Sequence, residues 1–259
     1  MKKILSLSAA LFVFVLAGCD LITGTDPTDS STSTSTGVTA KALVGTWKKV
    51  RNDDNNVYTT QYTFYSDGTF INLSDECLNG THDYDADKGT YVVDSKGNVT
   101  FTCNYYANDL QSFSIPDDSQ WVYDSTPYIY TLPALIIGDQ LYLETFFIAQ
   151  GAVSGIVGTW AVESMHPDIN NNDTPTYTKI VLTFNNDGTM NEKIYNSTTG
   201  NYGLPEIEYT LTYTYSNGSL QMKTPEGQLS PVYKVIIFQN KYLILGNETS
   251  ATANAYFKQ

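Results

Sequence analysis

The motif Val-Gly-Thr-Trp occurs twice in the chain, at residues 44–47 and at residues 157–160. Each copy is followed by the pattern Thr-Phe-x-x-Asp-Gly-Thr, at residues 63–69 and 183–189. The two tryptophans are 113 residues apart (160 minus 47), which is the size of a domain, whereas the units of solenoid proteins are about 20–50 residues long. The sequence therefore predicts two copies of one small domain in tandem.

Both copies carry the pattern of short β-strands. In residues 209–215, Tyr or Leu alternates with Thr, which places the apolar groups on one face of an extended chain. Asp-Gly at 67–68 and 187–188 and Asn-Gly at 217–218 favour tight hairpins, because a type I′ turn needs positive φ at both central residues. We therefore expect an all-β fold, with each copy forming an antiparallel sandwich or an up-and-down barrel.

The repeat and the composition divide the chain into four segments. We expect a signal peptide at residues 1–18, a linker at residues 19–41, and β domains at residues 42–150 and 155–259. Each domain has about 105–110 residues, which is enough for an independent hydrophobic core. The linker is rich in Ser, Thr, Asp and Gly and cannot bury enough apolar surface to fold, so we expect a disordered tether.

The first residues are typical of an export signal. Lys2 and Lys3 precede an apolar run that ends at Gly18 and is too short for a helix that crosses a bilayer. The segment Leu16-Ala17-Gly18-Cys19 resembles the bacterial lipobox. The resemblance implies cleavage before Cys19 and attachment of lipid to Cys19, so that the lipid anchors the exported protein to a membrane of the bacterial cell envelope. Which membrane and leaflet carry the anchor stays open. The alternative is an ordinary secretory peptide with an incidental cysteine.

The two Gly-x-Trp motifs carry a second resemblance. Gly45-Thr46-Trp47 and Gly158-Thr159-Trp160 resemble the opening motif of lipocalins and related calycins, and the following Asp-Gly-Thr turns are similar to those of short lipocalin-like domains in bacterial lipoproteins. The resemblance implies two tandem antiparallel β-barrels. It also implies that Gly45, Trp47, Gly158 and Trp160 have a structural role at the barrel bases. The chain departs from the longer lipocalins in lacking a C-terminal helix pattern and in having Arg51 as its only arginine.

Two cysteines lie inside the first predicted domain. Cys77 and Cys103 are the remainder after Cys19, and in an exported protein such a pair is a candidate disulfide. Closing this loop of about 26 residues would stabilise the fold by about 3 kcal/mol in the chain-entropy model. The alternative is two buried free thiols.

The sequence contains no catalytic motif that we recognise, and its two histidines, His82 and His166, do not occupy equivalent positions in the repeats. We therefore expect a protein that is not an enzyme and has no cofactor. Asp83, Asp85 and Asp87 are spaced like calcium ligands, but Asp-rich segments are more often turns. We expect no metal site, and the alternative is that this segment forms a calcium loop.

The formal net charge of −13 argues against nucleic acid as a partner. We expect a monomer that binds a small apolar or amphipathic ligand inside a barrel, since barrels of about eight strands can hold one small ligand or be filled by their own side chains. The alternative is a surface adhesin or envelope scaffold with filled barrels and no internal ligand.

Overall fold

The computed structural model of the chain describes residues 38–53, 56–168, 174–247 and 253–259. The described residues contain sixteen strands, one four-residue helix, α2 (Ala40–Leu43), and one short 3-10 helix, η1 (Asp118–Gln120). The predicted all-β fold is confirmed. The strands are β1 (Gly45–Asp53), β2 (Asn56–Phe64), β3 (Thr69–Leu78), β4 (Thr81–Val93), β5 (Asn98–Ala107), β6 (Val122–Ile137), β7 (Gln140–Leu143), β8 (Phe146–Ala149), β9 (Gly158–Asp168), β10 (Thr174–Phe184), β11 (Thr189–Ser197), β12 (Ile207–Ser216), β13 (Ser219–Lys223), β14 (Tyr233–Phe238), β15 (Tyr242–Leu245) and β16 (Tyr256–Lys258).

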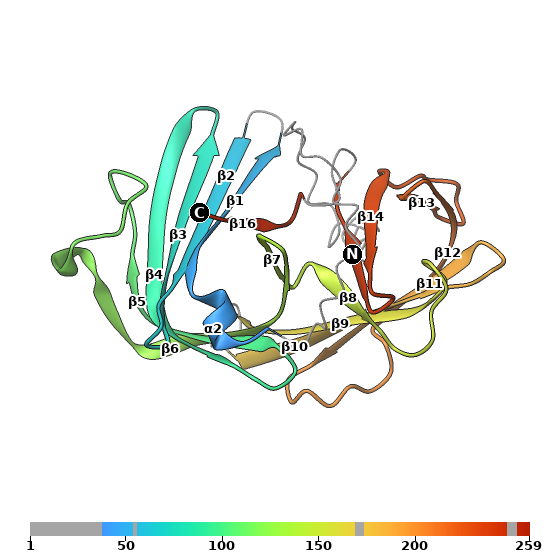
Figure 1. Cartoon of the computed structure of the whole chain (residues 1–259), viewed down its shortest axis with the longest axis horizontal. Helices are drawn as coiled ribbons and strands as arrows, with labels where there is room; N and C mark the ends of the chain where they lie inside the picture. Colours follow the sequence, from blue (N-terminus) through green and yellow to red (C-terminus); the bar gives the residue numbers. More distant parts are fainter. Residues whose placement is uncertain (1–37, 54–55, 169–173, 248–252) are drawn as a thin grey trace, which may run out of the picture.

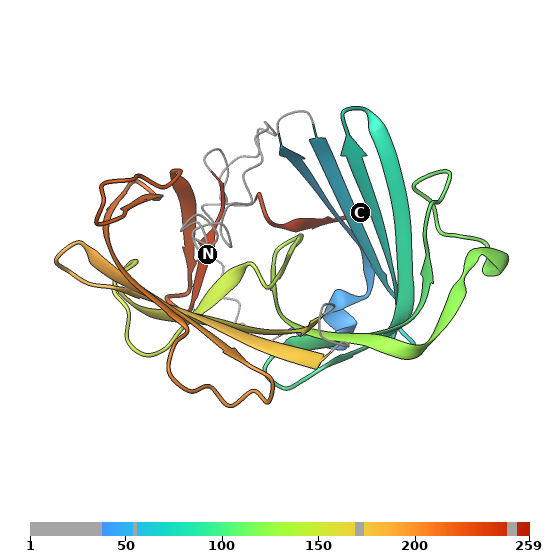
Figure 2. The same cartoon turned by 180° about the vertical axis from the view of Figure 1, so that it is seen from behind.

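The strands form two closed antiparallel rings within one continuous sheet. Barrel 1 consists of β1 to β7 and β16, because β16 pairs with both β7 and β1. Barrel 2 consists of β8 to β15, because β8 pairs with both β15 and β9 and β9 pairs with β10. The two rings lie side by side, with β6 and β9 between them (Figures 1 and 2). The pairing of Thr131 with Met165 joins the rings at this seam.

The last strand of each sequence copy lies in the ring of the other copy. By order along the chain, β8 ends the first copy and β16 ends the second. In the structure, Ile148 of β8 pairs with Ala161 and Tyr242 of barrel 2. Tyr256 of β16 pairs with Leu141 of barrel 1. Figure 1 shows the red β16 beside the blue β1. We call this arrangement the strand exchange.

The strand exchange gives boundaries that differ from those predicted from the repeat. Barrel 1 takes its strands from residues 45–143 and 256–258, and barrel 2 takes its strands from residues 146–245. Each predicted domain, 42–150 or 155–259, contains one strand that the structure places in the ring of the other domain. The reason is that the sequence repeat records the order of the strands, whereas hydrogen bonding decides which ring each strand completes.

The two tryptophans of the repeated motif occupy equivalent buried positions. Trp47 is 1% exposed and Trp160 is fully buried. The indole Nε1 of Trp47 donates a hydrogen bond of 2.7 Å to the carbonyl of Leu43, and that of Trp160 donates one of 2.8 Å to the carbonyl of Ile156. Each tryptophan indole therefore fixes the chain segment that leads into its own Gly-x-Trp strand.

The glycines of this motif have a conformation that other residues rarely adopt. Gly45 and Gly158 have φ of +129° and +139°. A Cβ atom on Gly158 would lie 2.5 Å from Cγ1 of Val153, a distance at which one of the two groups must move. Positive φ and this close contact explain why glycine stands before the tryptophan strand.

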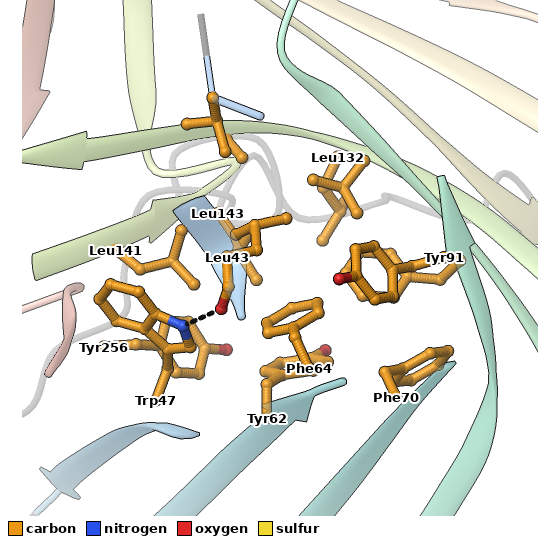
Figure 3. Close-up of a cluster of buried hydrophobic side chains, with 14 of the residues drawn as sticks. Leu43, Trp47, Tyr62, Phe64, Phe70, Tyr91, Leu132, Leu141, Leu143 and Tyr256 are labelled. Carbon is orange, nitrogen blue, oxygen red and sulfur yellow. Dashed lines mark hydrogen bonds between the residues drawn. The ribbon is translucent and has the colours of Figure 1, made fainter. Parts of the chain in front are cut away.

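The base of barrel 1 is a packed aromatic cluster. Side chains from α2, β1, β2, β3 and β7 converge on it, and the hydrogen bond from Trp47 to Leu43 crosses its edge (Figure 3). Phe64 stacks on Tyr62 with ring centroids 5.7 Å apart, and Phe70 meets Phe101 edge-on at 5.0 Å. The interior of barrel 1 is thus closed at the base, so that any site inside this ring lies beyond the level of Tyr62.

A smaller cluster fills the space between the rings. It contains Leu135, Tyr142, Phe146, Tyr242, Ile244 and Ala255. Five of them take strand positions that alternate with the inward-facing ones, and Ala255 directly precedes β16. The rings are therefore packed against each other as well as joined by hydrogen bonds. Among the described residues, we find no helix long and apolar enough to cross a membrane.

Candidate functional site

The inner face of barrel 1 becomes polar beyond its aromatic base. Residues directly opposite each other in an antiparallel pair share a face, and successive residues alternate between faces. Phe70, which belongs to the core, pairs with Gly89, and Asn72 pairs with Asp87. Asn72 and Asp87 therefore point inward, one step further from the base. We call the inward-facing polar groups beyond Phe70 the upper chamber.

The segment that resembled a calcium loop forms one wall of the upper chamber. Asp83, Asp85 and Asp87 lie in the extended strand β4, where alternate residues share the inner face. They are therefore not part of a loop, and the spacing that calcium loops share has a different cause here. In the described ranges, no group of three or more His, Cys, Asp or Glu side chains is arranged to hold a metal ion.

A pair of buried tyrosines forms the floor of the upper chamber. The hydroxyls of Tyr62 and Tyr130 are 3.3 Å apart, and both side chains are less than 10% exposed. Tyr256 packs edge-on against Tyr62 at 5.5 Å. Burial raises the pKa of Tyr62 and of Tyr130 well above the ordinary value. Both phenols therefore stay neutral and can each donate one hydrogen bond.

Asp87 and Cys103 lie beside this floor. Burial, and then the nearby charge of Asp85, raise the pKa of Asp87, while a hydrogen bond from Asn72 lowers it. Burial, and then the charge of Asp87, raise the pKa of the Cys103 thiol to about 12. Cys103 is therefore a neutral thiol and a poor nucleophile near neutral pH. The Oδ1 atom of Asn72 is buried and has no hydrogen-bond partner.

Strand β1 contributes positive charge to the same chamber. Lys49 and Arg51 share the face of Trp47, at every second position of the strand. The Lys49 ammonium lies 4.5 Å from the ring centroid of Tyr256, and the Arg51 guanidinium lies 4.3 Å from that of Tyr58. The Nε atom of Arg51 is buried without a hydrogen-bond partner. The chamber thus has cations on β1, carboxyl groups on β4 and an aromatic floor.

The two histidines are not brought together. His82 points away from the chamber, on the outer face of β4, and its Nδ1 lies 2.8 Å from Asp75. His166 comes from β9, and its Nε2 lies 3.1 Å from each carboxylate oxygen of Glu144. Its ring is parallel to that of Tyr130 with centroids 6.4 Å apart. A hydrogen bond with Glu144 raises the pKa of His166.

The two cysteines lie on opposite faces of the barrel wall. Cys103 points inward with Phe101, whereas Cys77 takes an outward position in β3, opposite His82. Both thiols are buried and free. The structure therefore has the two buried thiols that were the alternative and lacks the candidate disulfide. Cys19, the candidate site of lipid attachment, lies outside the described residues.

Sequence reasoning missed most of the upper chamber. Lys49 and Arg51 could have been found by counting every second residue from Trp47. Asn72 and Asp87 could have been found in the same way from Phe70 and Gly89. Tyr62 and Tyr130 could not be placed together, because 68 residues separate them and their contact depends on the closing of the ring.

Comparison with known proteins finds a family model that matches most of one ring. A family model described as a lipocalin-like domain matches residues 156–245. This stretch covers β9 to β15, which are seven of the eight strands of barrel 2. Neither a curated protein nor a solved structure matches the chain. Barrel 2 is therefore similar to lipocalin-like domains, and barrel 1 repeats its Gly-x-Trp start and its ring of eight antiparallel strands.

Proposed function

We propose that this protein is a non-catalytic binding protein that holds one small amphipathic ligand in the upper chamber of barrel 1. The observation that carries the proposal is the pair of buried polar atoms without partners, Arg51 Nε and Asn72 Oδ1. A buried polar group without a hydrogen bond costs about 1–3 kcal/mol. A ligand that accepts a hydrogen bond from Arg51 and donates one to Asn72 would recover this cost.

The chamber selects for a ligand with an apolar and a polar end. The neutral floor of Tyr62, Tyr130 and Tyr256 offers flat aromatic surface, which favours contact with apolar groups. The walls carry positive groups on β1 and acidic groups on β4. Such an arrangement suits a small molecule with an apolar ring or chain and both donor and acceptor groups. A lipocalin-like barrel fits this role.

Three of the buried groups at the floor of the chamber are poorly suited to chemistry near neutral pH. Catalysis near neutral pH needs a base or a nucleophile whose pKa is near the working pH. The pKa of Cys103 is raised to about 12, and the pKa values of Tyr62 and Tyr130 are raised further from neutrality. These three groups are therefore suited to holding a ligand in place and not to reacting with it.

We further propose that the protein is exported and held to the bacterial cell envelope by lipid on Cys19, with residues 19–41 as a tether and the rings as a monomer. The support is the sequence of the N-terminal segment. Substitution Cys19→Ser is expected to abolish incorporation of labelled fatty acid and to move the protein out of the membrane fraction. Unchanged incorporation would contradict the anchor without affecting the binding proposal.

Native mass spectrometry of protein purified from its own host tests the binding proposal. We expect a bound mass of a few hundred daltons or less on the parent protein. The Arg51→Met variant is expected to lose this mass, and the exposed Lys96→Met variant is expected to keep it. An empty parent protein, or a bound mass that survives Arg51→Met, would favour the alternative role as an adhesin or scaffold with filled barrels.

A further inference from the structure

Barrel 2 contains a buried carboxyl group that is surrounded by side chains of the hydrophobic core. Glu192 lies in β11 between Met190 and Ile194, at the inward positions of that strand, and is 4% exposed. It pairs with Leu182 of β10 and with Tyr209 of β12. These four neighbours either belong to the hydrophobic core of barrel 2 or pack against it. The carboxyl group therefore points into the interior of the ring.

One carboxyl oxygen of Glu192 has no hydrogen-bond partner in the described part of the chain. Its Oε1 atom is buried and makes no hydrogen bond. Burial alone raises its pKa to about 7. Burying an acid in this way is costly unless it is paired, and more than nine-tenths of this side chain is buried. A buried and unpaired carboxyl group destabilises the fold. We therefore infer that its partner comes from outside the chain.

The basic side chains of barrel 2 cannot supply that partner. Lys193 pairs outward with Glu208 at 3.0 Å, and Lys179 pairs outward with Glu163 at 2.9 Å. Lys223 and Lys234 also alternate with inward-facing residues and so face outward. Within the described strands of barrel 2, the inner face therefore carries no lysine, and the chain has no arginine beyond Arg51.

The equivalent position in barrel 1 shows that the fold does not require this acid. Asn72 lies two residues after Phe70, which pairs with Phe64, just as Glu192 lies two residues after Met190, which pairs with Phe184. Asn72 hydrogen-bonds to Asp87 of the neighbouring strand. In barrel 2 the position of Asp87 is taken by Tyr209, so Glu192 lacks the partner that Asn72 has.

The apolar groups beside Glu192 provide surface for a ligand. Ile207, Tyr209, Met222 and Ile237 pack against the core of barrel 2 but are only partly buried. Each pairs with an inward-facing residue and so shares the inner face. Methionine side chains adapt readily to different shapes. A small apolar body could therefore rest on these side chains with its polar end at Glu192.

We propose that the interior of barrel 2 is a second ligand site, in which the Glu192 carboxylate binds the protonated amine of a small molecule with an apolar body. The site goes beyond the function proposed for barrel 1, since it uses other residues and selects for positive charge. An ammonium group would donate hydrogen bonds to both carboxylate oxygens, and such charge-assisted bonds are stronger than neutral ones.

The charge of Glu192 gives the site a defined pH dependence. An amine binds the carboxylate and not the neutral acid, so affinity should fall about tenfold per pH unit below pH 7 and level off above it. The other ionisable side chains on the inner face of β12 and β14 are the phenols of Tyr209, Tyr213 and Tyr233, and burial raises the pKa of Tyr213. His166 of β9 is held by Glu144 of the segment between the rings.

Calorimetric titration of the protein from residue 20 onward with hexylamine, hexanol and hexanoate tests the proposal. These probes share one apolar chain and differ in charge. We expect hexylamine to bind at least tenfold more tightly than the other two at pH 8, and to lose this advantage at pH 5. Glu192→Gln is expected to remove the preference for hexylamine while leaving hexanol binding unchanged.

Two further variants keep the test decisive. Arg51→Met in barrel 1 is expected to leave hexylamine binding intact, so that failure of the site in barrel 1 is distinguishable from failure of this one. Glu192→Met replaces the acid by an apolar group of similar length and is also expected to remove the preference for hexylamine. It serves as the test if Glu192→Gln folds poorly. Equal affinity for all three probes, no binding of hexylamine, or binding that survives both Glu192 variants would overturn the proposal.

Discussion

At the scale of single residues, the energetic cost of an ionised Glu192 can be measured as a dependence of stability on pH. Burial raises the pKa of Glu192 to about 7 in the folded protein from its ordinary value of 4.5. Below pH 4.5 the acid is protonated in both states and contributes no difference. Between pH 4.5 and pH 7 the folded state binds more protons, so stability decreases as the pH rises.

The Glu192→Gln variant should therefore differ from the parent only at higher pH. We expect it to be about 3 kcal/mol more stable than the parent at pH 8 and nearly equal at pH 4, because one pKa unit corresponds to about 1.4 kcal/mol. Urea unfolding at both pH values measures the difference. If the difference in unfolding free energy between variant and parent were the same at both pH values, this would contradict the buried position of Glu192.

Two substitutions of Trp47 separate the contribution of its buried ring to stability from that of its hydrogen bond. Trp47→Ala removes the buried ring and should cost about 3–5 kcal/mol. Trp47→Phe keeps most of the apolar volume but leaves the Leu43 carbonyl without its donor, which should cost about 1–3 kcal/mol. Thermal unfolding of the two variants beside the parent measures both values. A Trp47→Ala variant that melts with the parent would exclude a role in the core.

At the scale of elements, strand alternation decides the chemistry of the two cysteines. Cys77 and Cys103 point to opposite sides of one barrel wall and are both free. We expect neither thiol to react quickly with a thiol reagent in the native protein, because both are buried, and both to react in urea without added reductant. Absorbance of the released chromophore counts the reactive thiols. Fewer than two in urea, for protein that lacks Cys19, would indicate a disulfide.

Alternation within strands was predictable, and the pairing of strands was not. The Tyr-Thr alternation of residues 209–215 lies within β12, since local spacing alone decides which side chains share a face. The same rule, applied to Asp83, Asp85 and Asp87, gives an acidic stripe on β4, although the spacing also fits calcium ligands. The short strands β8 and β16 carry no signal for their partners, because two rings of similar pattern offer each of them equivalent edges.

At the scale of the whole molecule, the strand exchange predicts that a short C-terminal deletion damages the N-terminal ring. Removing residues 253–259 takes away β16 and the buried Tyr256, and it leaves β1 and β7 without a shared neighbour. We expect loss of the upper chamber and a melting transition that is lower for barrel 1. Removing only Gln259 serves as the matched control and should have little effect.

Tryptophan fluorescence can assign the transition to a ring. In a Trp160→Phe background the buried Trp47 reports on barrel 1, and in a Trp47→Phe background the buried Trp160 reports on barrel 2. We expect the deletion to shift the transition seen by Trp47 further than the one seen by Trp160. Equal shifts would mean that the two rings unfold as one unit, and no shift of the Trp47 signal would contradict the role of β16.

The exchange of β8 and β16 also fixes the order in which the two sets of strands are completed during synthesis. All strands of barrel 2 have been synthesised by residue 245, whereas barrel 1 still needs residues 256–258. The ring that is started first is therefore finished last. Until then β1 and β7 present unpaired edges, which are templates for pairing with other chains. A chain that stops before residue 256 would have one complete barrel and one that is open to aggregation.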